Sequence, residues 1–187
     1  MEKIDPRHLL IKIAGILERL NIPYIITGGM AVLVWGRPRF TADIDIVVEL
    51  EQKNLPALEK ALRELSDGGY VDYEMMKDAL QREGEFNFVD GETGVKVDFW
   101  ILKQDDFDKS RIKHRVEKEV LGKKIYFTTA EDLILIKLKW YKESESSRQK
   151  EDVESIFKIS GEKLDMSYIN SWAVKLELTD TLKEIIK

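Results

Sequence analysis

The sequence predicts an α+β fold in which a mixed β-sheet flanked by helices is followed by a C-terminal helical subdomain. Short apolar segments typical of strands alternate with amphipathic helical patterns as far as Thr128, and from Thr129 onward the pattern is helical. We therefore divide the chain into an α/β core over residues 1–128 and a helical subdomain over 129–187. The 187 residues suffice for one domain or for two small ones that share a core.

The composition excludes several classes of protein. The chain has no cysteine, which rules out disulfides and thiolate metal sites, and its two histidines are too far apart in sequence to form a zinc site by themselves. No apolar run approaches the roughly 20 residues that a membrane span needs. The charged N-terminus does not have the pattern of a signal peptide. We expect a cytoplasmic protein without a membrane partner.

Helices and strands are expected to alternate over the first 65 residues. Apolar residues at helical spacing indicate amphipathic helices, and the short apolar runs between them indicate strands. Pro38 ends the short helix that Gly28-Gly29 opens, because its ring and its missing N–H do not fit a helix interior. The expected elements are a helix over about 6–20, a strand over 24–27, a helix from 28 to about 35, a strand over 43–48 and a helix over 55–65.

The middle of the chain is predicted to be rich in strands. The segments 90–94 and 121–123 are turn signals, and the second is typical of a hairpin. Thr129 is a candidate N-cap for the first C-terminal helix, with Asp132 as the acidic residue of a capping box. Expected strands are 70–73, 85–89, 95–102, 115–120 and 124–128, with a short helix or turn over 75–82; expected helices are 130–141, 149–159 and 167–176, with a last turn near the C-terminus.

The segment richest in chemical information joins the Gly-Gly pair to two aspartates on the next strand. Asp43 and Asp45 are two residues apart in an apolar strand, so their side chains share one face. Two carboxylates held side by side repel each other unless a proton or a cation lies between them. Oxygen ligands suit magnesium, which leaves room for substrate phosphates. Gly28-Gly29 offers backbone N–H groups to such phosphates at the start of a helix. The combination predicts phosphoryl or nucleotidyl transfer.

Asp98 is a candidate third carboxylate of this group. It lies in the otherwise apolar strand 95–102, where an unpaired charge would be costly. By itself it is more simply a surface-facing or strand-end aspartate. Together with Asp43 and Asp45 it would complete a site for two metal ions, which clamp the attacking and leaving oxygens of an in-line displacement. In that site Asp98 is positioned to act as the general base.

The spacing of these residues resembles the signature of the polymerase-β-like nucleotidyltransferase superfamily. A hydrophobic residue and Gly28-Gly29 are followed, after thirteen residues, by Asp-hydrophobic-Asp-hydrophobic, and Asp98 in Val-Asp-Phe matches the third carboxylate. The segment 39–45 resembles the Arg-x-Thr-x-Asp-hydrophobic-Asp element of AbiEii-type nucleotidyltransferases, many of which are toxins of toxin–antitoxin pairs. Lys137 on its helix, with Arg148 and Asp152 after it, is similar to the C-terminal pattern of that group.

This resemblance implies a nucleotidyltransferase-type fold, an NTP substrate and a two-metal mechanism with magnesium or manganese as cofactor. It implies that the glycines cradle the triphosphate and that the aspartates hold the metals. The residues assigned to nucleotide binding are Gly28, Gly29, Arg39, Thr41 and Lys137, and those assigned to catalysis and metal binding are Asp43, Asp45 and Asp98.

Two side chains have simpler alternatives. Within the apolar run 133–141, a lysine usually extends its ammonium group to solvent, whereas the resemblance implies that Lys137 contacts the nucleotide phosphates and neutralises their charge. Arg148 and Asp152 are four residues apart. They are compatible with an ordinary exposed helix pair worth ~0.2–0.5 kcal/mol, or with a role near the nucleotide or the acceptor.

The charge of the chain is unevenly distributed. The net charge is −5, yet residues 109–124 hold seven basic residues against two acidic ones. This basic strip is either a solvated hairpin with charged outer faces or a local site for a polyanion. The leading hypothesis is an enzyme that moves an NMP from an NTP to a hydroxyl of RNA, a protein or a small molecule. The basic strip favours RNA or protein, or a cognate antitoxin as partner. Alternatives are a catalytically silent nucleotide- or partner-binding regulatory module and an antibiotic nucleotidyltransferase.

Overall fold

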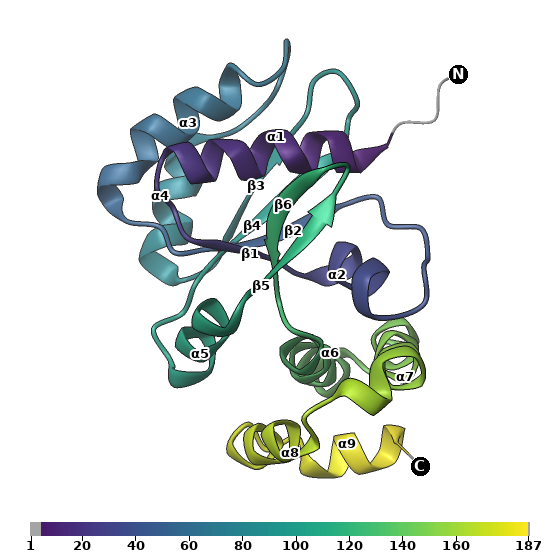
Figure 1. The fold of residues 1–187 in the computed structure, drawn as a ribbon. Coiled ribbons are helices and arrows are strands. Elements are labelled where there is room, and N and C mark those ends of the chain that lie inside the picture. Colours follow the sequence, from purple (N-terminus) through teal and green to yellow (C-terminus); the bar gives the residue numbers. More distant parts are fainter. Residues whose placement is uncertain (1–4, 187) are drawn as a thin grey trace.

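The computed structural model describes residues 5–186, which form a six-stranded mixed sheet with helices on both faces (Figure 1). The strand order is β3-β4-β2-β1-β6-β5. The pairs β2–β4 and β1–β6 are parallel, and the other neighbouring pairs are antiparallel. The strands are β1 (Tyr24–Ile26), β2 (Ile44–Val48), β3 (Glu85–Val89), β4 (Lys96–Ile101), β5 (Val116–Val120) and β6 (Lys123–Phe127). The predicted α+β class with a mixed sheet is confirmed.

The helices lie where hydrophobic periodicity and capping residues predict most of them. In Figure 1, α6 to α9 gather on one side of the molecule, with α6 nearest the sheet. The side chain of Thr129 accepts a hydrogen bond from the N–H of Asp132, as expected of an N-cap. The α-helices are α1 (Pro6–Arg19), α2 (Gly28–Trp35), α3 (Leu55–Arg63), α4 (Tyr73–Arg82), α5 (Asp106–His114), α6 (Ala130–Ser144), α7 (Ser147–Ser160), α8 (Met166–Lys175) and α9 (Thr179–Ile185).

Two segments differ from the sequence-based expectation. Residues 70–73 are not a strand: Tyr70 makes a single β-bridge to Val89, and Asp72 caps α4 instead. Helix α5 was not expected, because its few apolar residues give no clear helical period. It is started by the side chain of Asp105, which accepts a hydrogen bond from the N–H of Asp108. A local cap thus outweighs a weak periodicity in both segments.

The main hydrophobic cluster runs from the sheet into the C-terminal helices. It joins strand residues such as Ile46 to Leu133 of α6 and Ile169 of α8. The core therefore extends across the expected boundary at residue 128, and the division into 1–128 and 129–187 stays a prediction. Within residues 5–186, no helix has the length and apolar character needed to cross a membrane.

The second face of the sheet carries a smaller buried cluster of Ile25, Val47, Leu102 and Ile112, with Trp100 packed against it. Side chains alternate between the faces of a strand. Asp45 therefore shares a face with Val47, and Asp98 shares it with Trp100. The two carboxylates consequently lie on the face that also meets α5 and α6.

Candidate active site

The Gly28-Gly29 turn is built to accept two side chains from the following segment. Gly28 has a φ of +57°, and a Cβ atom there would lie 1.8 Å from Oδ2 of Asp45. A Cβ atom at Gly29 would lie 2.3 Å from Oγ1 of Thr41. Glycine is thus required at both positions by close approach, and at Gly28 also by the left-handed backbone. The start of α2, Asp45 and Thr41 form one packed unit.

Asp45 and Asp98 lie directly opposite each other. Their Cα atoms are register partners between the parallel strands β2 and β4. Burial, and then the negative charge of Asp98, raise the pKa of the Asp45 carboxyl, while the positive charge of Lys137 acts in the other direction. Asp43 lies one residue before β2 and is exposed. The structure therefore brings Asp45 and Asp98 together on adjacent strands, with Asp43 at their edge.

Asp98 has a partner that the sequence did not point to. Nζ of Lys96 lies 2.7 Å from Oδ1 and 3.0 Å from Oδ2 of Asp98. The two residues are separated by one position in β4, so their side chains share a face. The hydrogen bond from Lys96 to Asp98 raises the pKa of the lysine. An ammonium group thus stands against the carboxylate that was expected to bind metal.

A second charge cluster joins the loop before β2 to helices α6 and α7. Arg39 donates to both carboxylate oxygens of Asp152, from Nε at 2.7 Å and from Nη2 at 2.8 Å. Nζ of Lys137 lies 2.8 Å from Oδ2 of the same carboxylate. Burial alone would raise the pKa of Asp152, but these two cations hold it below its ordinary value. Of the two alternatives for Arg148 and Asp152, the structure differs from the exposed helix pair, because the buried carboxylate is paired with Arg39 and Lys137.

Lys137 does not extend into bulk solvent. Only 5% of the residue is exposed, and burial lowers the pKa of its ammonium group in spite of the bond to Asp152. The structure therefore differs from the solvent-exposed alternative for this lysine. Its side chain lies between two cavities, and both are lined by Asp45, Lys137 and Gln149.

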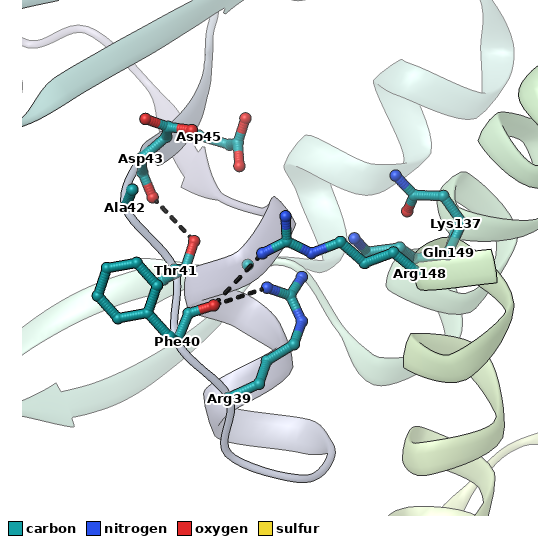
Figure 2. A pocket seen from close by; sticks show the side chains of 10 residues that line it. Arg39, Phe40, Thr41, Ala42, Asp43, Asp45, Lys137, Arg148 and Gln149 are labelled. Carbon is teal, nitrogen blue, oxygen red and sulfur yellow. Dashed lines mark hydrogen bonds between the residues drawn. The ribbon is translucent and has the colours of Figure 1, made fainter. Parts of the chain in front are cut away.

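The smaller cavity, of about 250 Å³, lies between the loop 39–43 and helices α6 and α7 (Figure 2). The guanidinium groups of Arg39 and Arg148 both donate to the carbonyl oxygen of Phe40, over 3.1 Å and 3.3 Å. They bring two positive charges to the wall that Lys137 also lines. The residues that line the smaller cavity are Gly29, Arg39, Phe40, Thr41, Ala42, Asp43, Asp45, Lys137, Arg148 and Gln149.

The donor atoms fit a hard divalent cation at Asp45 and Asp98. Two carboxylates on adjacent strands offer oxygen ligands, and a cation between them would relieve the repulsion that raises the pKa of Asp45. Over residues 5–186, no three His, Asp or Glu side chains are already grouped closely enough to hold a metal ion. The arrangement with Asp43 as a third ligand stays a prediction.

A mixed sheet that carries a carboxylate pair beside a Gly-Gly turn is the nucleotidyltransferase fold, and solved structures agree. The antibiotic-resistance factor ANT(2″)-Ia matches with a TM-score of 0.58 at 16% identity, over 95% of this chain and 91% of that one. The lincosamide antibiotic adenylyltransferase LnuA matches with a TM-score of 0.52 at 14% identity, over 83% of this chain and 98% of that one. An antigenic nucleotidyltransferase-like protein from Paracoccidioides brasiliensis matches with a TM-score of 0.50 at 15% identity, over 95% of this chain and 91% of that one. These likenesses establish the fold.

The sequence carries the assignment further. The model of the AbiEii family, described as the nucleotidyl transferase AbiEii toxin of type IV toxin–antitoxin systems, matches residues 16–123. The match covers more than half of the chain, and the protein belongs to this family. Among curated proteins, none matches.

Proposed function

We propose that the protein transfers a nucleoside monophosphate from an NTP to an acceptor hydroxyl and releases pyrophosphate. The observation that carries the proposal is the register pairing of Asp45 with Asp98, with the Asp45 carboxylate packed against Gly28, in a chain of the AbiEii family. Lys96 offsets part of the charge of Asp98, and the raised pKa of Asp45 indicates that the carboxylate pair is still costly to maintain. A function in metal-assisted phosphoryl chemistry accounts for it.

The smaller cavity is the proposed site of the triphosphate. Lys137, Arg39 and Arg148 line it with positive charge, and Gly29 lies in its wall at the start of α2. Backbone N–H groups at a helix start and guanidinium groups are the usual partners of phosphate oxygens. Thr41, packed on Gly29, completes this wall. Asp152 then acts by holding Arg39 and Lys137 in place.

Asp45 and Asp98, with Asp43, would hold magnesium or manganese, which supplies charge stabilisation at the phosphoryl oxygens when bound. The acceptor oxygen forms a bond to the α-phosphorus, and the bond from that phosphorus to the bridging oxygen breaks. The electron pair of that bond leaves with pyrophosphate. The acceptor's proton passes to the carboxylate of Asp98, which must first release Lys96. Lys137 neutralises charge on the phosphates.

The acceptor and the biological role are less closely defined. Membership of a family of type IV toxins favours a toxin that works with a cognate antitoxin, with RNA or protein among the acceptors. One structure of similar fold is that of ANT(2″)-Ia in complex with adenylyl-2″-tobramycin, which keeps a small molecule among the candidate acceptors. The second candidate function is a catalytically silent binding module, which the ion pair between Lys96 and Asp98 favours.

A label-transfer experiment separates these candidates. The protein is incubated with each α-labelled NTP, magnesium or manganese, and total RNA or cell lysate, and the label is traced. We expect incorporation by the wild type, loss with Asp45→Asn, and no loss with Asp67→Asn, the same change at an exposed position outside both cavities. Equal transfer by the wild type and Asp45→Asn would contradict the proposal. Binding of NTP with no transfer to any acceptor would support the silent module.

A further inference from the structure

The larger cavity, of about 670 Å³, lies on the other side of Asp45 and Lys137 from the proposed triphosphate site. It is walled by the ends of β1 and β4 and by α5 and α6, which stand on the same side of the sheet in Figure 1. Its volume is within the range of about 300–1,000 Å³ that small-molecule sites occupy. A ligand there would contact Asp45 directly.

Carboxylates dominate the charge around this cavity. Besides Asp45, its wall includes the exposed side chains of Glu83, Glu85 and Glu143, and that of Asp105. Among its cations, Arg111 is paired with Asp108, and Lys137 shares the single negative charge of Asp152 with Arg39. The wall also includes two exposed lysines, Lys103 and Lys139, which are fewer than its carboxylates. A polyanion would therefore meet net repulsion at this cavity.

Aromatic side chains form part of the same wall. The rings of Trp100 and Trp140 meet edge to face with centroids 5.6 Å apart, and Phe107 lies nearby in the lining. Trp140 is 41% exposed, so its ring is accessible to a ligand. The face of a tryptophan ring attracts an ammonium group. The aromatic surface and the carboxylates thus both favour a positively charged ligand.

A buried hydroxyl in the wall supplies an independent sign of a polar ligand. Thr27 lines the cavity and is 6% exposed, and its Oγ1 has no hydrogen-bond partner among residues 5–186. Thr27 is the N-cap residue of α2, but its side chain makes no capping hydrogen bond. A buried hydroxyl left without a partner costs about 1–3 kcal/mol, so a polar ligand group that bonds to it would remove this cost.

The basic strip over residues 109–124 contributes one residue, Arg111, to the larger cavity, and Arg111 is paired with Asp108. Lys123 and Lys124 lie in neither lining, and Lys124 is paired with Glu117 on the same hairpin. Nζ of Lys118 lies 4.0 Å from the centre of the Trp35 ring. Part of the positive charge that favoured RNA in the sequence is therefore engaged in contacts within the protein. Lys118, Lys123 and Lys124 lie outside both cavity linings.

We propose that the larger cavity binds the acceptor, and that the acceptor is a small hydroxyl-bearing molecule with positively charged amino groups. The amino groups lie among Trp140 and the carboxylates of Glu83, Glu85 and Glu143, and a hydroxyl near Thr27 points at Asp45. That hydroxyl oxygen forms the new bond to the α-phosphorus of the NTP, pyrophosphate leaves with the electron pair, and the proton passes to the carboxylate pair. This inference rests on the proposed function and names its substrate class.

The test compares two sugars that differ in charge and retain their hydroxyl groups. Calorimetry measures binding of the glucosamine disaccharide, which carries two amines, and of its N,N′-diacetyl form, which is neutral. We expect at least tenfold tighter binding of the cationic sugar. The double variant Glu83→Gln with Glu143→Gln should lose this preference, and Glu92→Gln with Glu119→Gln, at exposed positions outside both cavities, should keep it. Arg148→Gln, in the smaller cavity, should weaken NTP binding and leave sugar binding unchanged.

Equal binding of the two sugars, or a preference that survives the Glu83 and Glu143 changes, would overturn the inference. Label transfer provides the separate readout for the proposed function. Transfer of label to RNA or protein without binding of the cationic sugar would remove this inference and retain the nucleotidyltransferase. Binding of the cationic sugar with no label moving to any acceptor would overturn both.

Discussion

Replacing Gly28 by alanine tests how closely the Gly-Gly turn and Asp45 depend on each other. The left-handed backbone at Gly28, with φ +57°, costs an alanine about 1–2 kcal/mol. The added Cβ would also lie 1.8 Å from Oδ2 of Asp45, whereas ordinary contacts begin at 3.4 Å. The carboxylate must therefore retreat by roughly 1.6 Å, the difference between these two distances, and leave its place opposite Asp98.

Gly94 provides a matched control. It has a φ of +70°, and a Cβ atom there would meet nothing within 4 Å. Gly94→Ala therefore carries the same backbone strain as Gly28→Ala without the contact to a carboxylate. We expect urea denaturation to show a loss of about 1–2 kcal/mol for Gly94→Ala from backbone strain alone. Gly28→Ala should lose more.

Activity should separate the two variants further. A displacement of about 1 Å at a reacting centre can cost on the order of 100-fold in rate. We expect metal-dependent label transfer to fall about 100-fold with Gly28→Ala and to stay near wild type with Gly94→Ala. If both variants lose the same stability and keep the same transfer rate, Asp45 does not depend on the Gly28 backbone and the reasoning fails.

Four further outcomes are expected. Asp152→Asn should lower the free energy of unfolding by about 3–5 kcal/mol in urea, because it leaves Lys137 and a guanidinium group without their buried partner. The lowered pKa of Asp152 contributes stability above its unfolded-state pKa of about 3.9 that is lost as the pH falls through the folded value, so the variant should show a flatter acid limb in a pH series of melting temperatures. The raised pKa of Asp45 affects stability in the opposite direction, because its ionised form lowers the stability of the fold at neutral pH. Asp45→Asn should therefore melt at a higher temperature than wild type without metal, and its melting temperature should rise less with magnesium or manganese and NTP. An equal rise in both proteins would place the metal elsewhere. Lys123→Glu with Lys124→Glu should leave transfer and its salt dependence unchanged, because neither lysine lines a cavity. A steep salt dependence of transfer that this double change removes would instead indicate an RNA acceptor.

Much of the site was predictable because its signals are local. Gly28-Gly29 at the end of a strand, and two aspartates at spacing i and i+2 in the next strand, constrain the backbone within a few residues. The alternation of side chains in strand 95–102 likewise places Asp98 on one definite face. The family match covers residues 16–123, a range that contains these motifs.

The partners of these charges were decided by the tertiary structure alone. Arg39 and Asp152 are 113 residues apart in sequence, whereas the helical spacing of Arg148 and Asp152 left a local pair open as one alternative. Asp152 is buried where the loop before β2 meets α6 and α7, so the cations that are buried with it become its partners, whatever their distance along the chain. Local spacing determines which face of an element a side chain occupies. Which charge neutralises a buried carboxylate depends on which elements pack together around it.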